Sequence, residues 1–331
     1  MRRWHGPVGV LLSLGVLAFI FYRLDLAALG RALAGAHYAY VVPLVATTVL
    51  LLWIGALQWR YLLSLVKWVP PLRLFGAQMV GALAGSLVQV QVGGLVKAYV
   101  VARRERLSTS TVLATTITDH LVHGFAFLGL LGVVLWFTDL PLASTQAQGA
   151  LRTAGWMTLG LDLGLVAILV ALAVFPAGGR RAVERALSLP PARWAAWGGE
   201  IYTRFREGIG WPARWRDRAF LLTYAMGRTA IAPIEYYWLA GALGLRLPWT
   251  AYPFLLVSLS FLMFLSRSLG IRGGFQAGMV VLLGFYGVSK ETAVATALLF
   301  GAVSRGVTMG LGLLFLWVEG ITKDELRVLA A

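Results

Sequence analysis

Five cationic side chains interrupt long apolar stretches of the sequence, where an unpartnered charge is costly. They are Lys97, Arg228, Arg267, Arg272 and Arg305. A Lys or Arg held at the centre of a bilayer costs ~2.5 to 3.5 kcal/mol on insertion scales, so each of them needs a partner. The same stretches hold few acidic side chains, namely Asp119, Asp162 and Glu235. The positive surplus predicts an anionic ligand that neutralises it.

Three of these cations lie beside two glycine pairs. Gly93-Gly94 comes one helical turn before Lys97, whereas Gly273-Gly274 directly follows Arg272 and comes shortly after Arg267. A break in a helix frees backbone N–H groups, and these favour anions, as does the N-terminus of the helix that follows. We therefore predict a substrate-binding site formed by the three cations and both glycine pairs. The alternative is that the long side chains reach to the nearer membrane interface.

The other charged side chains allow ion pairs as well as ligand contacts. Asp119 and His123 are four residues apart and share a helix face, where they form either a proton relay or a structural hydrogen-bonded pair. Arg305 could contribute to the anion site or pair with Asp119. Arg228 and Glu235 are seven residues apart on one face, which favours a structural pairing role.

Signatures of catalysis and of metal binding are missing from the sequence. It contains no His-Glu-x-x-His motif, no nucleophile elbow and no Walker loop. It contains no cysteine, which excludes disulfides, thiolate metal sites and cysteine nucleophiles. A metal site needs three or four protein ligands, and the surroundings of Asp119 and His123 do not supply them. We expect no enzymatic activity, no metal and no cofactor.

The elements that must position these residues are membrane helices. Hydrophobic residues make up 59% of the chain and charged residues 13%, and the mean hydropathy is +0.77. This composition predicts an all-α polytopic membrane protein, with residues 1–331 forming a single membrane domain. A crossing needs ~20 apolar residues. Segments of suitable length lie at 7–22, 41–57, 110–138, 155–175, 219–243 and 292–318.

Two further apolar stretches, 72–102 and 250–287, are too long for one crossing, and each contains a glycine pair. Each is predicted to be a re-entrant hairpin of two half-length helices joined at the glycines. Each half of the chain then has the order span, span, hairpin, span, over about 7–138 and 155–318. Because each half crosses three times, the halves enter the membrane in opposite orientations. This inverted repeat brings the glycine turns together near the midplane, with Lys97 close to Arg272.

The basic residues of the loops fall mostly on one side of this topology. By the positive-inside rule that side is the cytoplasm, and both termini are predicted to lie there. The net charge of +15 is explained in this way, so nucleic acid is not an expected partner. The segment 176–218 combines many arginines with tryptophans and other aromatic residues, which is typical of helices that lie on an anionic membrane surface.

The motifs around the glycine pairs resemble those of the lysylphosphatidylglycerol synthase transmembrane family, also called flippase-like proteins. The first motif is Gln91-Val92-Gly93-Gly94, followed by Ser108-Thr109 and by Asp119 in the next span. The second motif is Gly273 to Gly278, followed by Gly287-Val288-Ser289 and closed by Trp317-Val318-Glu319-Gly320. The Gln-Val-Gly-Gly and Trp-x-Glu-Gly sequences look most like the branch associated with hopanoids. The chain departs from the family pattern at Ala277, where relatives are usually acidic, and near Val100, where an arginine is expected.

The resemblance implies a multi-pass protein of the bacterial inner membrane that moves lipids between leaflets or toward the outer membrane. The lipid would be anionic or amphiphilic: a phospholipid, an isoprenoid phosphate or a hopanoid. The soluble aminoacyl-transferase domain of fused relatives is absent from this sequence, so synthase activity is not implied. Two alternatives remain: a membrane-embedded headgroup transferase with Asp119 and His123 as acid and base, and a non-catalytic partner in a lipid-export complex. The expected partners are membrane lipids and, in the last case, other export proteins.

Overall fold

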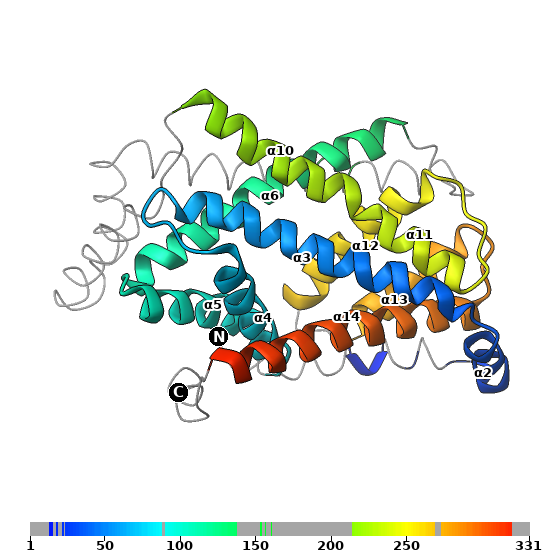
Figure 1. Cartoon of the computed structure of the whole chain (residues 1–331). Coiled ribbons are helices and arrows are strands. Elements are labelled where there is room, and N and C mark those ends of the chain that lie inside the picture. Colours follow the sequence, from blue (N-terminus) through cyan, green and yellow to red (C-terminus); the bar gives the residue numbers. More distant parts are fainter. Residues whose placement is uncertain are drawn as a thin grey trace, which may run out of the picture. The chain divides into compact units, whose positions relative to one another are not determined.

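The regular secondary structure of the described residues is helical. The computed structural model describes residues 24–87, 90–137, 214–268 and 273–319, together with the isolated positions 13–15, 18, 22, 153, 156 and 160. Within these residues every regular element is a helix and none is a strand (Figure 1). The prediction of an all-α polytopic membrane protein is confirmed.

Among the described residues, three helices are long and apolar enough to cross a bilayer. They are α3 (Val41–Leu63), α6 (Thr109–Phe137) and α14 (Lys290–Glu319). At ~1.5 Å per residue each exceeds the ~30 Å of a hydrocarbon core. They agree with the crossings predicted at 41–57, 110–138 and 292–318. The crossing predicted at 155–175 and the basic segment 176–218 lie outside the described residues, as does most of the crossing at 7–22.

The crossing predicted at 219–243 is not one continuous helix. The structure divides it into α10 (Trp215–Ile231) and α11 (Pro233–Ala242). Pro233 has no N–H to donate to the preceding turn, and its ring collides with the carbonyl four residues earlier. Ala232, between the two helices, keeps helical backbone angles, so α11 follows α10 without a loop.

The two stretches that contain the glycine pairs each fold into two helices. The first consists of α4 (Pro71–Leu87) and α5 (Val90–Glu105), which pack against each other, and the second of α12 (Ala251–Ser268) and α13 (Gly274–Gly284) (Figure 1). The helix pairs agree with the expected hairpins. Whether either pair is re-entrant stays a prediction.

The glycine pairs do not play equivalent parts in the two hairpins. Gly273 adopts the left-handed conformation, with φ at 91°, and Gly274 begins α13, so this pair lies between the two helices of its hairpin. The expectation was wrong for Gly93-Gly94, because both residues lie within α5. A Cβ on Gly93 would be 2.6 Å from the carbonyl oxygen of Gly81 in α4. Gly93 is therefore required for close helix packing and not for a turn.

The chain divides into two compact units, and each takes segments from both halves of the sequence. Unit 1 comprises Met1–Leu51, Gly129–Gly155 and Thr229–Gly306, and unit 2 comprises Leu52–Leu128, Trp156–Arg228 and Val307–Ala331. The second hairpin belongs to unit 1 and the first hairpin to unit 2. The units do not coincide with the repeats predicted at 7–138 and 155–318, and the repeat itself stays a prediction.

The base of the first hairpin is fixed by one buried carboxylate. The Nζ atom of Lys67 is 2.8 Å from Oε2 of Glu105 and also donates to the Glu105 carbonyl at 2.9 Å. The guanidinium of Arg73 donates to Oε1 of Glu105 at 3.2 Å. Glu105 thus joins the connection after α3, the start of α4 and the end of α5.

Candidate functional site

Lys97, the cation predicted to lie within the membrane in the first hairpin, has partners from two other helices of unit 2. Its Nζ atom is 3.9 Å from Oδ2 of Asp119 in α6 and 3.8 Å from the ring centroid of Trp59 in α3. Lys97 is 7% exposed and Asp119 is 4% exposed. A cation over an indole face is attracted by the ring quadrupole, and the attraction grows when water is excluded. This Lys97–Asp119–Trp59 arrangement is called the lysine cluster below.

Neighbouring polar groups hold the lysine cluster in place. The indole N–H of Trp59 donates to Oγ1 of Thr115 at 3.1 Å, and Thr115 in turn donates to the Val112 carbonyl at 2.8 Å. Gln58, which is fully buried, donates to the backbone carbonyl of Asp119 at 3.2 Å. These bonds orient the aromatic ring and fix α3 against α6.

Three buried polar atoms near the lysine cluster have no hydrogen-bond partner among the described residues. They are Oε1 of Gln58, Oδ1 of Asp119 and Nδ1 of His123. An orphaned polar atom in a protein interior carries a desolvation cost of roughly 1 to 3 kcal/mol. Asp119 also has His120 near it, with Nδ1 at 3.9 Å from Oδ2, but the His120 side chain is largely exposed. His123 makes no direct pair with Asp119, so the proposed relay between them stays a prediction.

Two further charged residues, Arg228 and Glu235, have neighbours within their own units. The guanidinium of Arg228 lies against Gly55, where a Cβ would be 3.2 Å from its terminal nitrogen. Glu235 accepts a hydrogen bond from the hydroxyl of Thr48. Arg228 belongs to α10 and Glu235 to α11, and the pairing role predicted for these two residues stays a prediction.

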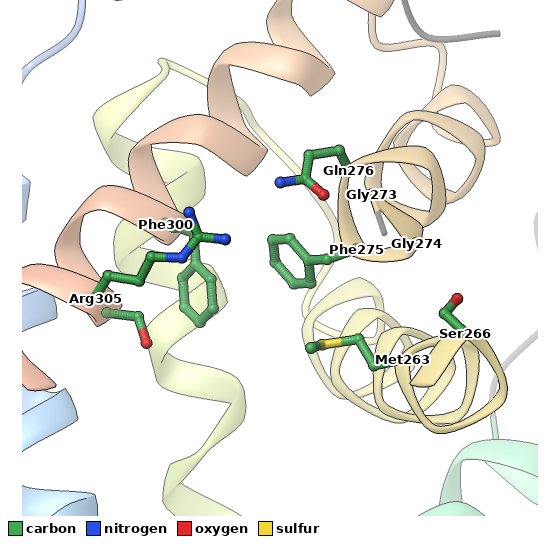
Figure 2. A pocket seen from close by; sticks show the side chains of 10 residues that line it. Met263, Ser266, Gly273, Gly274, Phe275, Gln276, Phe300 and Arg305 are labelled. Atoms are coloured by element: carbon green, nitrogen blue, oxygen red, sulfur yellow. The ribbon is translucent and has the colours of Figure 1, made fainter. Parts of the chain in front are cut away.

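The second glycine turn opens into a cavity of about 340 Å³ within unit 1, called the α13 cavity below. Its lining residues come from α12, the α13 N-terminus and α14: Met263, Ser266, Gly273, Gly274, Phe275, Gln276, Phe300, Gly301, Ser304 and Arg305. Figure 2 shows the Arg305 guanidinium extending from α14 toward Phe275 and Gln276 of α13. Three of the eight predicted site residues, Gly273, Gly274 and Arg305, are therefore brought together.

The local sequence explains how the α13 cavity forms. A Cβ on Gly274 would overlap the Ser266 hydroxyl, so only glycine lets α12 and α13 approach this closely. Gly273 caps α13 without a side chain, which leaves the first N–H groups of the helix without a side-chain acceptor. Phe275 of α13 and Phe300 of α14 stack with centroids 5.4 Å apart. The cavity thus combines a helix N-terminus, one guanidinium and an aromatic wall.

Two of the predicted site cations lie outside the described side chains. Arg272 lies outside the described residues, and Arg267 belongs to α12 but its side chain is not described. The predicted proximity of Lys97 and Arg272 therefore stays a prediction. Trp59, Gln58 and Phe300 were not anticipated. For Trp59 a signal existed, since an indole among aliphatic residues in a membrane helix usually finds an acceptor for its N–H.

The described residues contain no group of three or more His, Asp or Glu side chains that could hold a metal ion. The polar contacts observed among these residues are ion pairs and hydrogen bonds.

Comparison with protein families identifies the class of protein to which this chain belongs. The family model of the lysylphosphatidylglycerol synthase TM region matches residues 7–312. The chain belongs to this family. No curated protein and no solved structure shows a significant match. The matched range of this lysylphosphatidylglycerol synthase TM family member contains the residues of both the lysine cluster and the α13 cavity. It is a multi-pass membrane protein from a family that acts on lipids.

Proposed function

We propose that the protein is a lipid flippase or lipid transporter that binds an anionic or amphiphilic headgroup in the α13 cavity. The observation that carries the proposal is the exposed guanidinium of Arg305 beside the N-terminus of α13. Arg binds phosphate oxygens through paired hydrogen bonds, and a helix N-terminus adds partial positive charge. Membership in a lipid-acting family supports a lipid as the anion.

The dimensions and lining of the cavity suit one end of a lipid. A volume of about 340 Å³ lies at the lower end of the range of small-molecule pockets, so it accommodates a headgroup and not a whole lipid. Gln276 and Ser304 supply polar groups near Arg305, whereas Met263, Phe275 and Phe300 supply apolar surface. A headgroup bound here would have polar contacts on one side and apolar contacts where the acyl chains begin.

The test is lipid exchange between leaflets in reconstituted vesicles. Purified protein is placed in vesicles that contain a fluorescent phosphatidylglycerol, and the accessibility of the dye to an aqueous quencher is followed with time. Arg305→Gln should lose most of the accelerated exchange. Arg246→Gln serves as the matched control, because Arg246 is an exposed arginine of the same unit that does not line the cavity.

Failure of the wild-type protein to accelerate exchange of phospholipid, isoprenoid phosphate and hopanoid substrates would overturn the proposal. Equal rates of lipid exchange for Arg305→Gln and the wild type would show that the α13 cavity is not the binding site. The same vesicles are extracted for chromatography, since a chemically altered headgroup would favour the alternative of a headgroup transferase. In that case Asp119→Asn should abolish the product.

A further inference from the structure

A short helix in unit 1 has an apolar side that the described residues cover only in part, since Leu26 is exposed and Leu29 and Leu33 are half-buried. Helix α2 (Leu26–Ala34) contains no buried residue, and Leu26 at its start is 67% exposed. The side chain of Asp25 caps it by accepting from the N–H groups of Ala27 at 2.8 Å and Ala28 at 3.1 Å. Nine residues span only ~14 Å, which is less than half of a hydrocarbon core. Helix α2 therefore cannot cross a membrane.

Its residues divide into two faces. Leu26, Leu29 and Leu33 are spaced by three and four residues, so they lie along one side of the helix. Arg31 lies on the other side, exposed to solvent, and makes only a loose ion pair with Asp25 at 3.9 Å. A short helix with leucines on one side and a cation on the other is typical of segments that lie in the plane of a membrane interface.

Helix α2 is held at the end of unit 1 where two membrane helices begin. The N–H of Asp25 donates to Glu291 at 3.5 Å, and Lys290 donates to the Tyr22 carbonyl at 2.6 Å, both at the start of α14. After α2 the chain passes through a short 3-10 helix, η1 (Tyr38–Tyr40), directly into α3. The N–H of His37 donates to the carbonyl of Ala242 at the end of α11.

The same end of unit 1 carries a group of aromatic side chains. Its members are Tyr40, Tyr237, Trp238, Trp249 and Tyr252. Trp249 is 72% exposed and stacks on Tyr237 with centroids 5.1 Å apart. Trp and Tyr concentrate where a membrane protein meets the headgroups, because their rings are apolar at one end and polar at the other. This aromatic group locates the interface independently of α2.

From these two observations we infer that α2 lies in the headgroup region of the bilayer with its leucine face in the lipid. The occupant of that face is lipid, since the aromatic group at the same end of unit 1 already marks the headgroup level. Helix α2 and the aromatic group together hold the starts of α3 and α14 at a fixed depth.

The cysteine-free sequence makes the test direct, because one introduced cysteine gives one labelling site. Leu26→Cys and its matched control Arg31→Cys are each labelled with an environment-sensitive fluorophore. The full chain is then reconstituted into vesicles of phosphatidylcholine and phosphatidylglycerol. The label at position 26 should emit at shorter wavelength, be several-fold less sensitive to aqueous iodide and be quenched by a nitroxide near the lipid headgroup. The label at position 31 should respond mainly to iodide.

Equal iodide quenching at the two positions would overturn the inference, because both faces of α2 would then be in water. Protection of position 26 from both quenchers would also overturn it, because protein and not lipid would cover the leucine face. Leu29→Cys is a second site on the same face and should repeat the behaviour of position 26. Loss of lipid exchange in Arg305→Gln has no bearing on these readings.

Discussion

Lys97 illustrates how a single charge can be accommodated inside a membrane protein. Its ammonium group has a carboxylate on one side, with the Asp119 oxygen at 3.9 Å, and the face of the Trp59 indole on the other, with the centroid at 3.8 Å. Both contacts are electrostatic, and both gain strength where water is excluded. The residue therefore has structural partners of its own, in contrast to Arg305, which lines a cavity.

The lysine cluster predicts a characteristic pattern of stability. Lys97→Met and Asp119→Leu should each destabilise the protein by about 3 to 5 kcal/mol, because each leaves a buried charge without its partner. The double variant should recover most of this loss. Thermal unfolding in detergent micelles measures all three, and His120→Ala is the control because its side chain is exposed.

A different result would change the role of Lys97. If Lys97→Met kept the stability of the wild type but lost lipid exchange, the ammonium group would be a ligand contact, as the sequence predicts.

The sequence identified the charged residues of both sites but not all of their partners. A lysine or arginine among apolar residues is visible in the sequence because its cost in a bilayer demands an explanation. Gly273, Gly274 and Arg305, which the sequence predicts to share a site, line one cavity in the structure. The partnership of Lys97 with Trp59 was not predicted, because it depends on how α3, α5 and α6 pack, and hydrophobic periodicity does not contain that information.

At the scale of elements, two adjacent glycines of α5 should respond oppositely to the same substitution. Gly93→Ala should destabilise the α4–α5 hairpin by roughly 1 to 3 kcal/mol, since the new methyl would meet the Gly81 carbonyl oxygen at 2.6 Å. Gly94→Ala should be neutral or stabilise by about 0.5 to 1 kcal/mol, because nothing lies within 4 Å and alanine is the better helix former. Thermal unfolding of both variants checks the contrast. Equal effects would contradict the packing role of Gly93.

The base of the same hairpin should be sensitive to acid. The hydrogen bond from Lys67, together with Arg73, holds the pKa of Glu105 below its ordinary value of 4.5. Because the pKa of Glu105 is lower in the folded protein than in the unfolded chain, its ionised carboxylate stabilises the fold at pH values above 4.5. This stabilisation is lost as the pH falls from 4.5 toward the pKa of the folded state.

Glu105→Gln should therefore be less stable than the wild type at pH 7, and the gap should shrink as the pH falls below about 4.5. Unfolding temperatures measured for both proteins across this range provide the test. A gap independent of pH would show that the Glu105 carboxylate contributes by packing alone.

The lengths of the elements were easier to predict than their breaks. Continuous apolar runs gave α3, α6 and α14 because a crossing requires a minimum length. The division into two helices at Pro233 was not predicted, whereas Gly93-Gly94 was predicted to be a break and is helical. Glycine permits both a turn and a close helix contact, so its presence alone does not decide between them.

At the scale of the whole molecule, the topology can be tested with the same cysteine-free background. Arg246→Cys should react with a membrane-impermeant maleimide in intact cells, and Arg103→Cys only after permeabilisation, if the loop charges follow the positive-inside rule. Leu87→Cys, at the exposed end of α4, should stay unlabelled from outside if the first hairpin is re-entrant. Labelling of Leu87→Cys in intact cells would show that α4 crosses the bilayer.

The contact of Gly81 with Gly93 also affects how α4 and α5 associate inside a membrane. In each glycine a hydrogen occupies the position of the missing Cβ, and each of these positions is 2.6 Å from the carbonyl oxygen of the other residue. The two Cα–H groups therefore point at each other's carbonyl oxygens as a reciprocal pair of weak hydrogen bonds, each worth roughly 0.5 to 1 kcal/mol. Such bonds need no polar side chain. The backbone itself therefore helps to hold α4 against α5, because the hydrocarbon of the bilayer offers neither helix a competing donor.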